Sequence, residues 1–213
     1  STISTFTSSG SLSLFGRISA SFTNNSSFNL QSGTFSVASI SQATNASGCS
    51  TSILMNGGAQ TGTLIYSGTT TWSQTGGGSS TTTLNGSGAT VNYAASGNQT
   101  VLNTSYTNLT LSGSGNKTLA AFSISGTLSI QGSAVGITTA PTFGASSTLE
   151  FKNVGTKTTN AIEWPASSGP SNLIIDNSGS IVTMPVSSAR TLSGNLTLTA
   201  GTLADAGNIL TVQ

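Results

Sequence analysis

The chain has 213 residues, of which 35% are hydrophobic and only 4% are charged, and its formal net charge is +1. Ordinary globular domains carry roughly 25% charged residues, so the chain lacks the basic surface that nucleic-acid binding requires. Intrinsic disorder is also disfavoured, because disordered chains combine few apolar residues with high net charge. We therefore expect a folded protein whose solubility depends on hydroxyl and amide groups.

Short apolar–polar–apolar triplets recur along the whole chain. Alternation with period two places the outer residues of a triplet on one face of a strand and the middle residue on the other. Gly, Asn and Ser turns separate the triplets, and no stretch shows helical periodicity. The triplets predict an all-β protein, and they are Leu12-Ser13-Leu14, Phe28-Asn29-Leu30, Phe35-Ser36-Val37, Val91-Asn92-Tyr93, Leu109-Thr110-Leu111, Phe122-Ser123-Ile124, Leu128-Ser129-Ile130, Leu149-Glu150-Phe151 and Leu196-Thr197-Leu198.

Residues 1–85 show the pattern only loosely. Gly33-Thr34-Phe35 and Gly62-Thr63-Leu64 resemble elements of the later sequence, but no complete repeat is present. We interpret this part as degenerate solenoid repeats or an N-terminal cap region. It contains the single cysteine, Cys49, which has no partner for an internal disulfide and is expected to be a buried, unreactive thiol.

Residues 86–213 contain an internal repeat of five elements. The first copy is Val91-Asn92-Tyr93, Asn108-Leu109-Thr110-Leu111, Lys117-Thr118-Leu119, Phe122-Ser123-Ile124 and Gly126-Thr127-Leu128. The second copy is Leu149-Glu150-Phe151, Asn172-Leu173-Ile174-Ile175, Arg190-Thr191-Leu192, Leu196-Thr197-Leu198 and Gly201-Thr202-Leu203. Unequal spacers between equivalent elements are typical of a solenoid, in which extra residues loop out between turns.

The repeat predicts a right-handed parallel β-helix, or β-solenoid, with a β-sandwich as the alternative. Turns of roughly 20 to 25 residues would give about nine rungs and a rod of ~45 Å at the usual spacing between strands. Residues 152–170 interrupt the alternation with Trp164-Pro165 and Pro170. Because proline cannot donate a hydrogen bond to a central strand, this segment is predicted to be a loop projecting from the stack.

Several strings resemble the repeats of large secreted cell-surface proteins of Bacteroidetes-type bacteria. These strings are 106–119 (YTNLTLSGSGNKTL), 169–175 (GPSNLII), 194–203 (GNLTLTAGTL) and the closing 207–212 (GNILTV). The resemblance covers about residues 85–213. It implies a parallel β-helix, export across the outer membrane, and a role in adhesion, gliding or extracellular fibres, and it offers no catalytic motif.

The residues that commonly perform catalysis or bind metals are scarce. There is no histidine, and the only carboxylates are Glu150, Glu163, Asp176 and Asp205. A glycosidase-like pair of Glu150 and Asp176 is one interpretation, and scattered surface acids are the favoured one. A weak cation site at Asp176-Asn177 or at Asp205 is a further, less favoured interpretation. We expect no enzymatic activity, no metal site and no cofactor.

Two surface features bear on ligand binding. Trp72 and Trp164, if exposed, would stack on sugar rings, whereas burial in the core is the favoured alternative for both. Outward threonines at Thr81-Thr82-Thr83 and Thr197-Leu198-Thr199 are candidates for ordering water on an ice-binding face.

The sequence as a whole predicts a non-enzymatic extracellular structural module, either a segment of a cell-surface adhesin or a subunit of a filament. Carbohydrate binding or ice binding is the alternative, and a polysaccharide-degrading β-helix enzyme is less favoured. No signal peptide and no membrane span is recognisable. The closing strand, 208–213, has no charge or proline to protect its edge, so we expect self-association or flanking β-repeats as partners, with surface glycans as further candidates.

Overall fold

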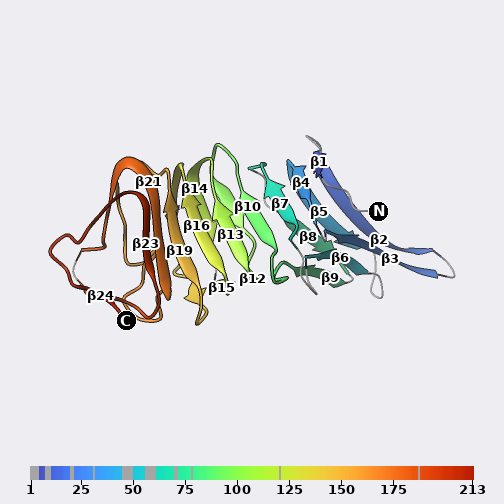
Figure 1. Ribbon diagram of the computed structural model, residues 1–213. Helices are drawn as coiled ribbons and strands as arrows, with labels where there is room; N and C mark the ends of the chain where they lie inside the picture. Colours follow the sequence, from blue (N-terminus) through green and yellow to red (C-terminus); the bar gives the residue numbers. More distant parts are fainter. Residues whose placement is uncertain are drawn as a thin grey trace.

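The computed structural model describes residues 5–7, 11–19, 22–30, 32–44, 50–55, 61–69, 72–77, 79–119, 121–186 and 188–213. Within these ranges the strands wind into an elongated rod, each turn of the chain lying against the one before it (Figure 1). Every regular element among the described residues is a β-strand, and none is a helix. The prediction of an all-β parallel β-helix is confirmed, and the β-sandwich alternative is wrong because the rungs stack in parallel. Cys49 lies outside the described residues.

One sheet, called the main sheet below, runs the length of the rod. Nine of its strands pair in parallel in chain order, so the chain makes eight turns between the first and the last. At ~4.8 Å per turn these strands span ~38 Å, slightly less than the predicted rod. They are β1 (Thr5–Thr7), β4 (Thr34–Val37), β7 (Thr63–Tyr66), β10 (Thr90–Tyr93), β13 (Asn108–Leu111), β16 (Thr127–Gln131), β19 (Thr148–Lys152), β21 (Asn172–Thr183) and β23 (Leu196–Ala204).

Smaller sheets form the other sides of the rod. Near the N-terminus, β2 (Ser11–Ser19), β5 (Ser39–Thr44) and β8 (Ser73–Gly76) join β3 (Phe22–Asn29), β6 (Ser50–Leu54) and β9 (Ser79–Thr83) through an antiparallel β2–β3 pair. In the middle, β11 (Gln99–Val101), β14 (Ser114–Leu119) and β17 (Ser133–Ile137) form the second side, and β12 (Ser105–Tyr106), β15 (Ser123–Ile124) and β18 (Thr142–Phe143) form the third. Near the C-terminus, β22 (Arg190–Leu192) pairs with β24 (Leu210–Val212).

The length of a turn changes along the rod, and this explains why the early repeats are hard to see in the sequence. Phe35, Leu64 and Val91 are equivalent by register and are 29 and 27 residues apart. Val91, Leu109 and Leu128 are also equivalent, yet only 18 and 19 residues apart. The main sheet continues without a break across residue 85, where the sequence pattern changes.

The core is a stack of inward side chains from successive main-sheet strands, as the triplets predict. From β4 to β21 these pairs are all at most 6% exposed, and they are Phe35 and Val37, Leu64 and Tyr66, Val91 and Tyr93, Leu109 and Leu111, Leu128 and Ile130, Leu149 and Phe151, and Leu173 and Ile175. Each fully buried aliphatic side chain contributes about 1.5–3 kcal/mol, so this column is the principal source of stability.

The structure corrects the alignment of the second repeat copy. Leu196 pairs with Leu173 in the main sheet, so Leu196-Thr197-Leu198 is equivalent to Leu128-Ser129-Ile130 and not to Phe122-Ser123-Ile124. The reason is that no strand of the third side is present among the described residues between β22 and β23. The chain therefore returns to the main sheet one element earlier than in the first copy.

The segment at 152–170 is not simply a projecting loop. It contains β20 (Lys157–Thr158), which pairs with the end of β21. Glu163 and Trp164 within it are both 0% exposed, and Lys157 Nζ lies 2.8 Å from Glu163 Oε1. This ion pair and the buried indole attach the part of the segment around Glu163 and Trp164 to the rod, so that part does not project from the stack.

Candidate functional site

Both tryptophans considered for sugar stacking are buried. Trp72 is 3% exposed, donates from Nε1 to Gln42 Oε1 at 3.2 Å, and packs against Tyr66 with ring centroids 6.5 Å apart. Trp164 is 0% exposed, and its carbonyl accepts a hydrogen bond from Arg190 Nε at 2.8 Å. The premise that these rings are exposed is therefore wrong, because neither presents a face to a ligand.

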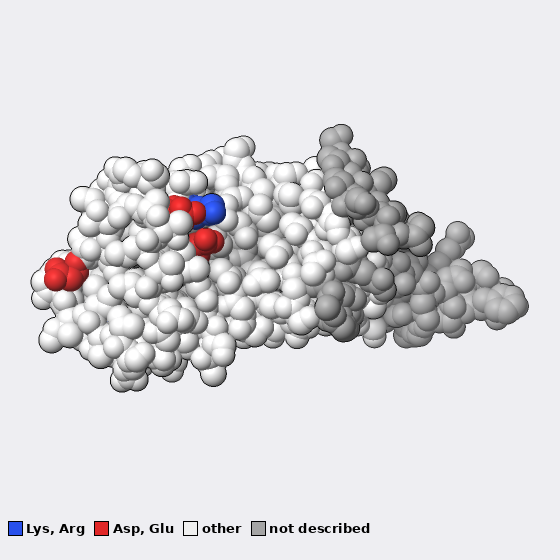
Figure 2. Space-filling view, viewed as in Figure 1, with Lys and Arg blue, Asp and Glu red and all other residues white. Residues whose placement is uncertain are grey.

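Two of the four carboxylates lie on the outer face of the main sheet. Lys152 Nζ is 2.8 Å from Asp176 Oδ2 on the neighbouring strand, and this hydrogen bond, together with the Asp176 charge, raises the pKa of Lys152. Glu150 accepts a hydrogen bond from Ser129, which accepts one from Gln131 at 2.9 Å. Figure 2 shows one small group of charged atoms at the middle of this face and otherwise almost no charge except near the C-terminal end. The charged side chains of this face are therefore each paired with a neighbouring side chain, Glu150 with Ser129 and Lys152 with Asp176.

The other two carboxylates are elsewhere. Glu163 is buried beside Lys157, and Asp205 is exposed in a turn where its Oδ1 accepts from the Gly207 N–H at 2.9 Å. Asn177, the neighbour of Asp176, is buried and donates to the Gly155 carbonyl at 2.7 Å. Over the described ranges, no three His, Cys, Asp or Glu side chains come close enough to hold a metal ion.

Polar side chains inside the rod form a feature that sequence reasoning missed. Gln99, Lys117 and Arg190 are each at most 2% exposed and lie on short strands of the second side of the rod or its C-terminal continuation. Gln99 Nε2 donates to the carbonyls of Tyr66 and Gly68 at 3.0 and 2.6 Å. We call these three residues the corner donors. Each donates hydrogen bonds to backbone carbonyls at a corner of the rod, where the chain leaves the main sheet or approaches the second side.

Lys117 continues this arrangement one turn later. Its Nζ donates to Gln99 Oε1 at 2.8 Å, to the Ala95 carbonyl at 3.1 Å and to the Gly97 carbonyl at 3.4 Å. No carboxylate is among its partners, and burial lowers the pKa of Lys117 to about 8. The ammonium ion therefore links two successive turns at the expense of its hydration.

Arg190 is the corner donor nearest the C-terminus. Nη1 donates to the carbonyls of Ser188 and Ala189 at 2.8 and 3.1 Å, in addition to the Nε bond to Trp164. Its Nη2 has no hydrogen-bond partner, and burial lowers the pKa of the guanidinium. The sequence signal was a repeated Gln/Lys/Arg-Thr-Val/Leu string at Gln99, Lys117 and Arg190, in which a polar residue holds an inward position.

Two asparagines bridge successive turns of the main sheet from its outer side. Asn108 donates from Nδ2 to the Ala89 carbonyl at 3.2 Å and accepts at Oδ1 from the Thr127 N–H at 3.0 Å. Asn172 makes the equivalent bonds, to Ser147 at 3.3 Å and from Asn195 at 2.9 Å. Gly126 and Gly194 allow this close approach, because a Cβ there would lie 2.6 and 2.4 Å from the asparagine oxygens. These residues have a structural role.

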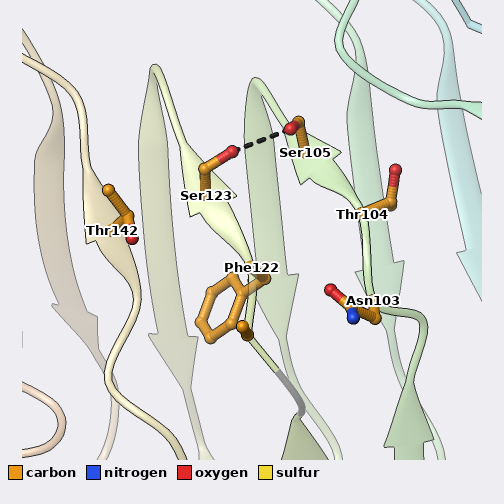
Figure 3. A pocket seen from close by; sticks show the side chains of 7 residues that line it. Asn103, Thr104, Ser105, Phe122, Ser123 and Thr142 are labelled. Carbon is orange, nitrogen blue, oxygen red and sulfur yellow. Dashed lines mark hydrogen bonds between the residues drawn. The ribbon is translucent and has the colours of Figure 1, made fainter.

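A shallow hollow lies on the third side of the rod (Figure 3). Its volume is about 400 Å³, and Ala121 contributes to its lining. Ser105, Ser123 and Thr142 face outward on three adjacent strands in register, and the Ser123 hydroxyl donates to the Ser105 hydroxyl at 2.8 Å. We call this hollow the hydroxyl groove, and its other lining residues are Asn103, Thr104, Ser105, Phe122, Ser123 and Thr142.

The last rung of the rod is open. Among the described residues, β23 pairs only with β21, and β24 pairs only with β22. Leu198 is in register with the buried Ile175 yet is 54% exposed, and Val212 is in register with the buried Leu192 yet is 47% exposed. We call β23 and β24 the C-terminal edge. Among the described residues, no rung covers Leu198 on the side of β23 away from β21.

A scan against protein-family models, a search of curated proteins and a search of solved structures each found no match to the chain. No helix among the described residues is long and apolar enough to cross a membrane. The class to which the chain belongs is therefore given by its architecture alone, a parallel β-helix repeat protein with an almost uncharged surface over the described residues.

Proposed function

We propose that this chain is a non-enzymatic structural module of an extracellular rod, as a segment of a cell-surface adhesin or as a filament subunit. The observation that carries this proposal is the C-terminal edge. Leu198 continues a column that is buried from β4 to β21, and Val212 lies in register with the buried Leu192. Both side chains are exposed only where the stack stops.

The chemistry of the C-terminal edge defines its partner. Among the described residues, the edge has unpaired backbone N–H and C=O groups together with apolar side chains, Leu198 at 54% and Val212 at 47% exposed. Main-chain groups and apolar side chains are satisfied together by a further parallel strand of the same kind. The partner is therefore another β-rung, supplied by a second copy of the chain or by flanking repeats.

The surface charge supports the same proposal. Of the basic side chains that the structure describes, Lys117 and Arg190 are buried and Lys152 and Lys157 are paired with carboxylates. Little long-range repulsion therefore opposes end-to-end approach of two copies. A neutral surface of hydroxyl and amide groups also fits a rod exposed to the medium better than one in a crowded cytoplasm.

Analytical ultracentrifugation and electron microscopy of the purified full chain test the assembly. We expect concentration-dependent end-to-end association, which Leu198→Lys abolishes because it places a charge where the next rung would stack. Thr197→Lys is the matched control, since Thr197 is the exposed outward neighbour on the same strand. A wild-type protein that stays monomeric at high concentration would contradict the filament-subunit form of the proposal and leave flanking repeats as the partner.

Location and lack of catalysis need separate tests. Antibodies against the chain should label intact source cells without permeabilisation, and labelling only after lysis would exclude an extracellular role. Turnover of any polysaccharide that is lost in Glu150→Gln or Asp176→Asn would show that the outer-face carboxylates are catalytic and would overturn the non-enzymatic assignment.

A further inference from the structure

The hydroxyl groove differs from the rest of the rod surface in shape and in the arrangement of its polar groups. Ser105, Ser123 and Thr142 form a ladder across three successive turns, with Cα partners in register. Adjacent rungs are ~4.8 Å apart, so the ladder presents hydroxyls at a regular, short interval. In Figure 3 the Ser105 and Ser123 hydroxyls point toward each other along this ladder.

The groove also has unsatisfied polar groups and an apolar part. The side chains of Asn103, Thr104 and Thr142 have no hydrogen-bond partner among the described residues, so an amide and two hydroxyls are available to a ligand. Ala121 is exposed and supplies apolar surface beside the polar groups, whereas Phe122 is 5% exposed and only borders the groove. A volume of about 400 Å³ falls within the range of small-molecule sites, although this one is shallow and open.

The lining determines the chemical class of the ligand. No residue of the groove is charged, so neither a phosphate nor a carboxylate would find a counter-ion there. A sugar has hydroxyls around its edge and an apolar C–H face, which matches an array of hydroxyls and amides beside apolar side chains. A linear polymer would meet the same ladder at each turn, whereas an isolated small polar molecule would gain little from the repetition.

We propose that the hydroxyl groove binds a neutral linear glycan that lies across β12, β15 and β18. Ser105, Ser123 and Thr142 hydrogen-bond successive hydroxyls of the glycan, Asn103 provides a donor and an acceptor at one end, and the exposed Ala121 contacts an apolar sugar face. The proposal goes beyond the structural role of the rod and is independent of its assembly, because the groove is on the side of the rod and not at the C-terminal edge.

The test is a binding measurement with a panel of neutral linear oligosaccharides of glucose, mannose, xylose and N-acetylglucosamine, using an array and then calorimetry. Thr142→Arg should abolish binding by filling the groove. Thr118→Arg is the matched control, since Thr118 is also an exposed threonine on a short strand but lies on the second side. The double variant Ser105→Ala with Ser123→Ala should weaken binding about thirtyfold, because two hydrogen bonds of about 1 kcal/mol each are lost.

Each outcome decides the proposal. Binding that is lost in Thr142→Arg and retained in Thr118→Arg supports it, provided that circular dichroism shows both variants folded. The proposal is overturned if no neutral oligosaccharide binds, if Thr142→Arg and Thr118→Arg bind equally, or if only acidic glycans bind.

Discussion

Raising the pH from 7 to about 9.5 should stabilise this protein, and Lys117 is the reason. Lys117 is 1% exposed and its ammonium group binds only carbonyl oxygens, so burial lowers its pKa from 10.5 to about 8. The unfolded chain therefore binds more protons than the folded chain between these values, and stability rises with pH in this window. The full difference corresponds to ~3 kcal/mol, of which ~2 kcal/mol is gained by about pH 9.5.

Two buried tyrosines set the upper limit of this stabilisation. Burial raises the pKa of Tyr93 to about 12 and that of Tyr106 well above its ordinary value of 10. The folded state keeps both phenols neutral while the unfolded state ionises them, so their contribution is complete below pH 10 and is lost as the pH rises further. Stability should therefore pass through a maximum between about pH 9 and pH 10.

Urea denaturation followed by circular dichroism at a series of pH values measures this effect. Wild type should show a rising midpoint from pH 7.5 to about 9.5 and a falling one above pH 10. Lys117→Met removes the titrating amine and should abolish the rise while keeping the fall. If the wild-type midpoint is flat or decreases from pH 7.5 to 9.5, the ammonium ion is not desolvated as the structure indicates and the reasoning fails.

Two further predictions concern backbone and core. Gly113 has φ +76°, and a Cβ there would lie 2.1 Å from the Ala95 carbonyl oxygen, whereas Gly155 has φ +67° and open space around it. Gly155→Ala should lower the free energy of unfolding by about 1–2 kcal/mol because of the left-handed backbone alone, and Gly113→Ala should lower it by at least ~2 kcal/mol more. Urea denaturation midpoints measure both losses, and equal losses would refute the predicted clash. Leu111 and Leu198 share one inward column of the main sheet. Leu111→Ala should lower the free energy of unfolding by about 2–5 kcal/mol, and Leu198→Ala should lower it by about 1 kcal/mol or less in dilute, unassembled protein. A large loss of stability from Leu198→Ala in dilute protein would show that the C-terminal edge is covered.

The sequence predicts the fold well because its main signal is local. Triplets such as Val91-Asn92-Tyr93 specify which side chains face inward independently of the residues that come after them, and in the main sheet they do so from β4 to β21. The register between turns is not local, since it depends on the length of each intervening turn. This is why the order of elements alone matches Leu196-Thr197-Leu198 with the wrong element of the first copy.

The candidate sites were harder to predict for two physical reasons. Charged residues are almost never fully buried, and the partners of Lys117 are backbone carbonyls, which have no sequence signature. The hydroxyl groove depends on three residues 18 and 19 positions apart, Ser105, Ser123 and Thr142, which become neighbours only when the turns between them have the right length. Serine and threonine are too common in this chain for such spacing to be noticed.

The parallel stacking of turns also determines how the rod would respond to tension. The hydrogen bonds between successive strands of the main sheet run along the rod axis, and β1 and β24 lie toward opposite ends of the rod (Figure 1). A pull on these ends would load one terminal strand at a time, so rungs would peel away in sequence instead of shearing together. Some side chains join adjacent turns by hydrogen bonds, such as Lys117 to the Ala95 carbonyl and Asn108 to Ala89 and Thr127. These hydrogen bonds would break one after another as the rungs detach, and each would require additional force. The rod would lengthen gradually under load and dissipate force over many small events.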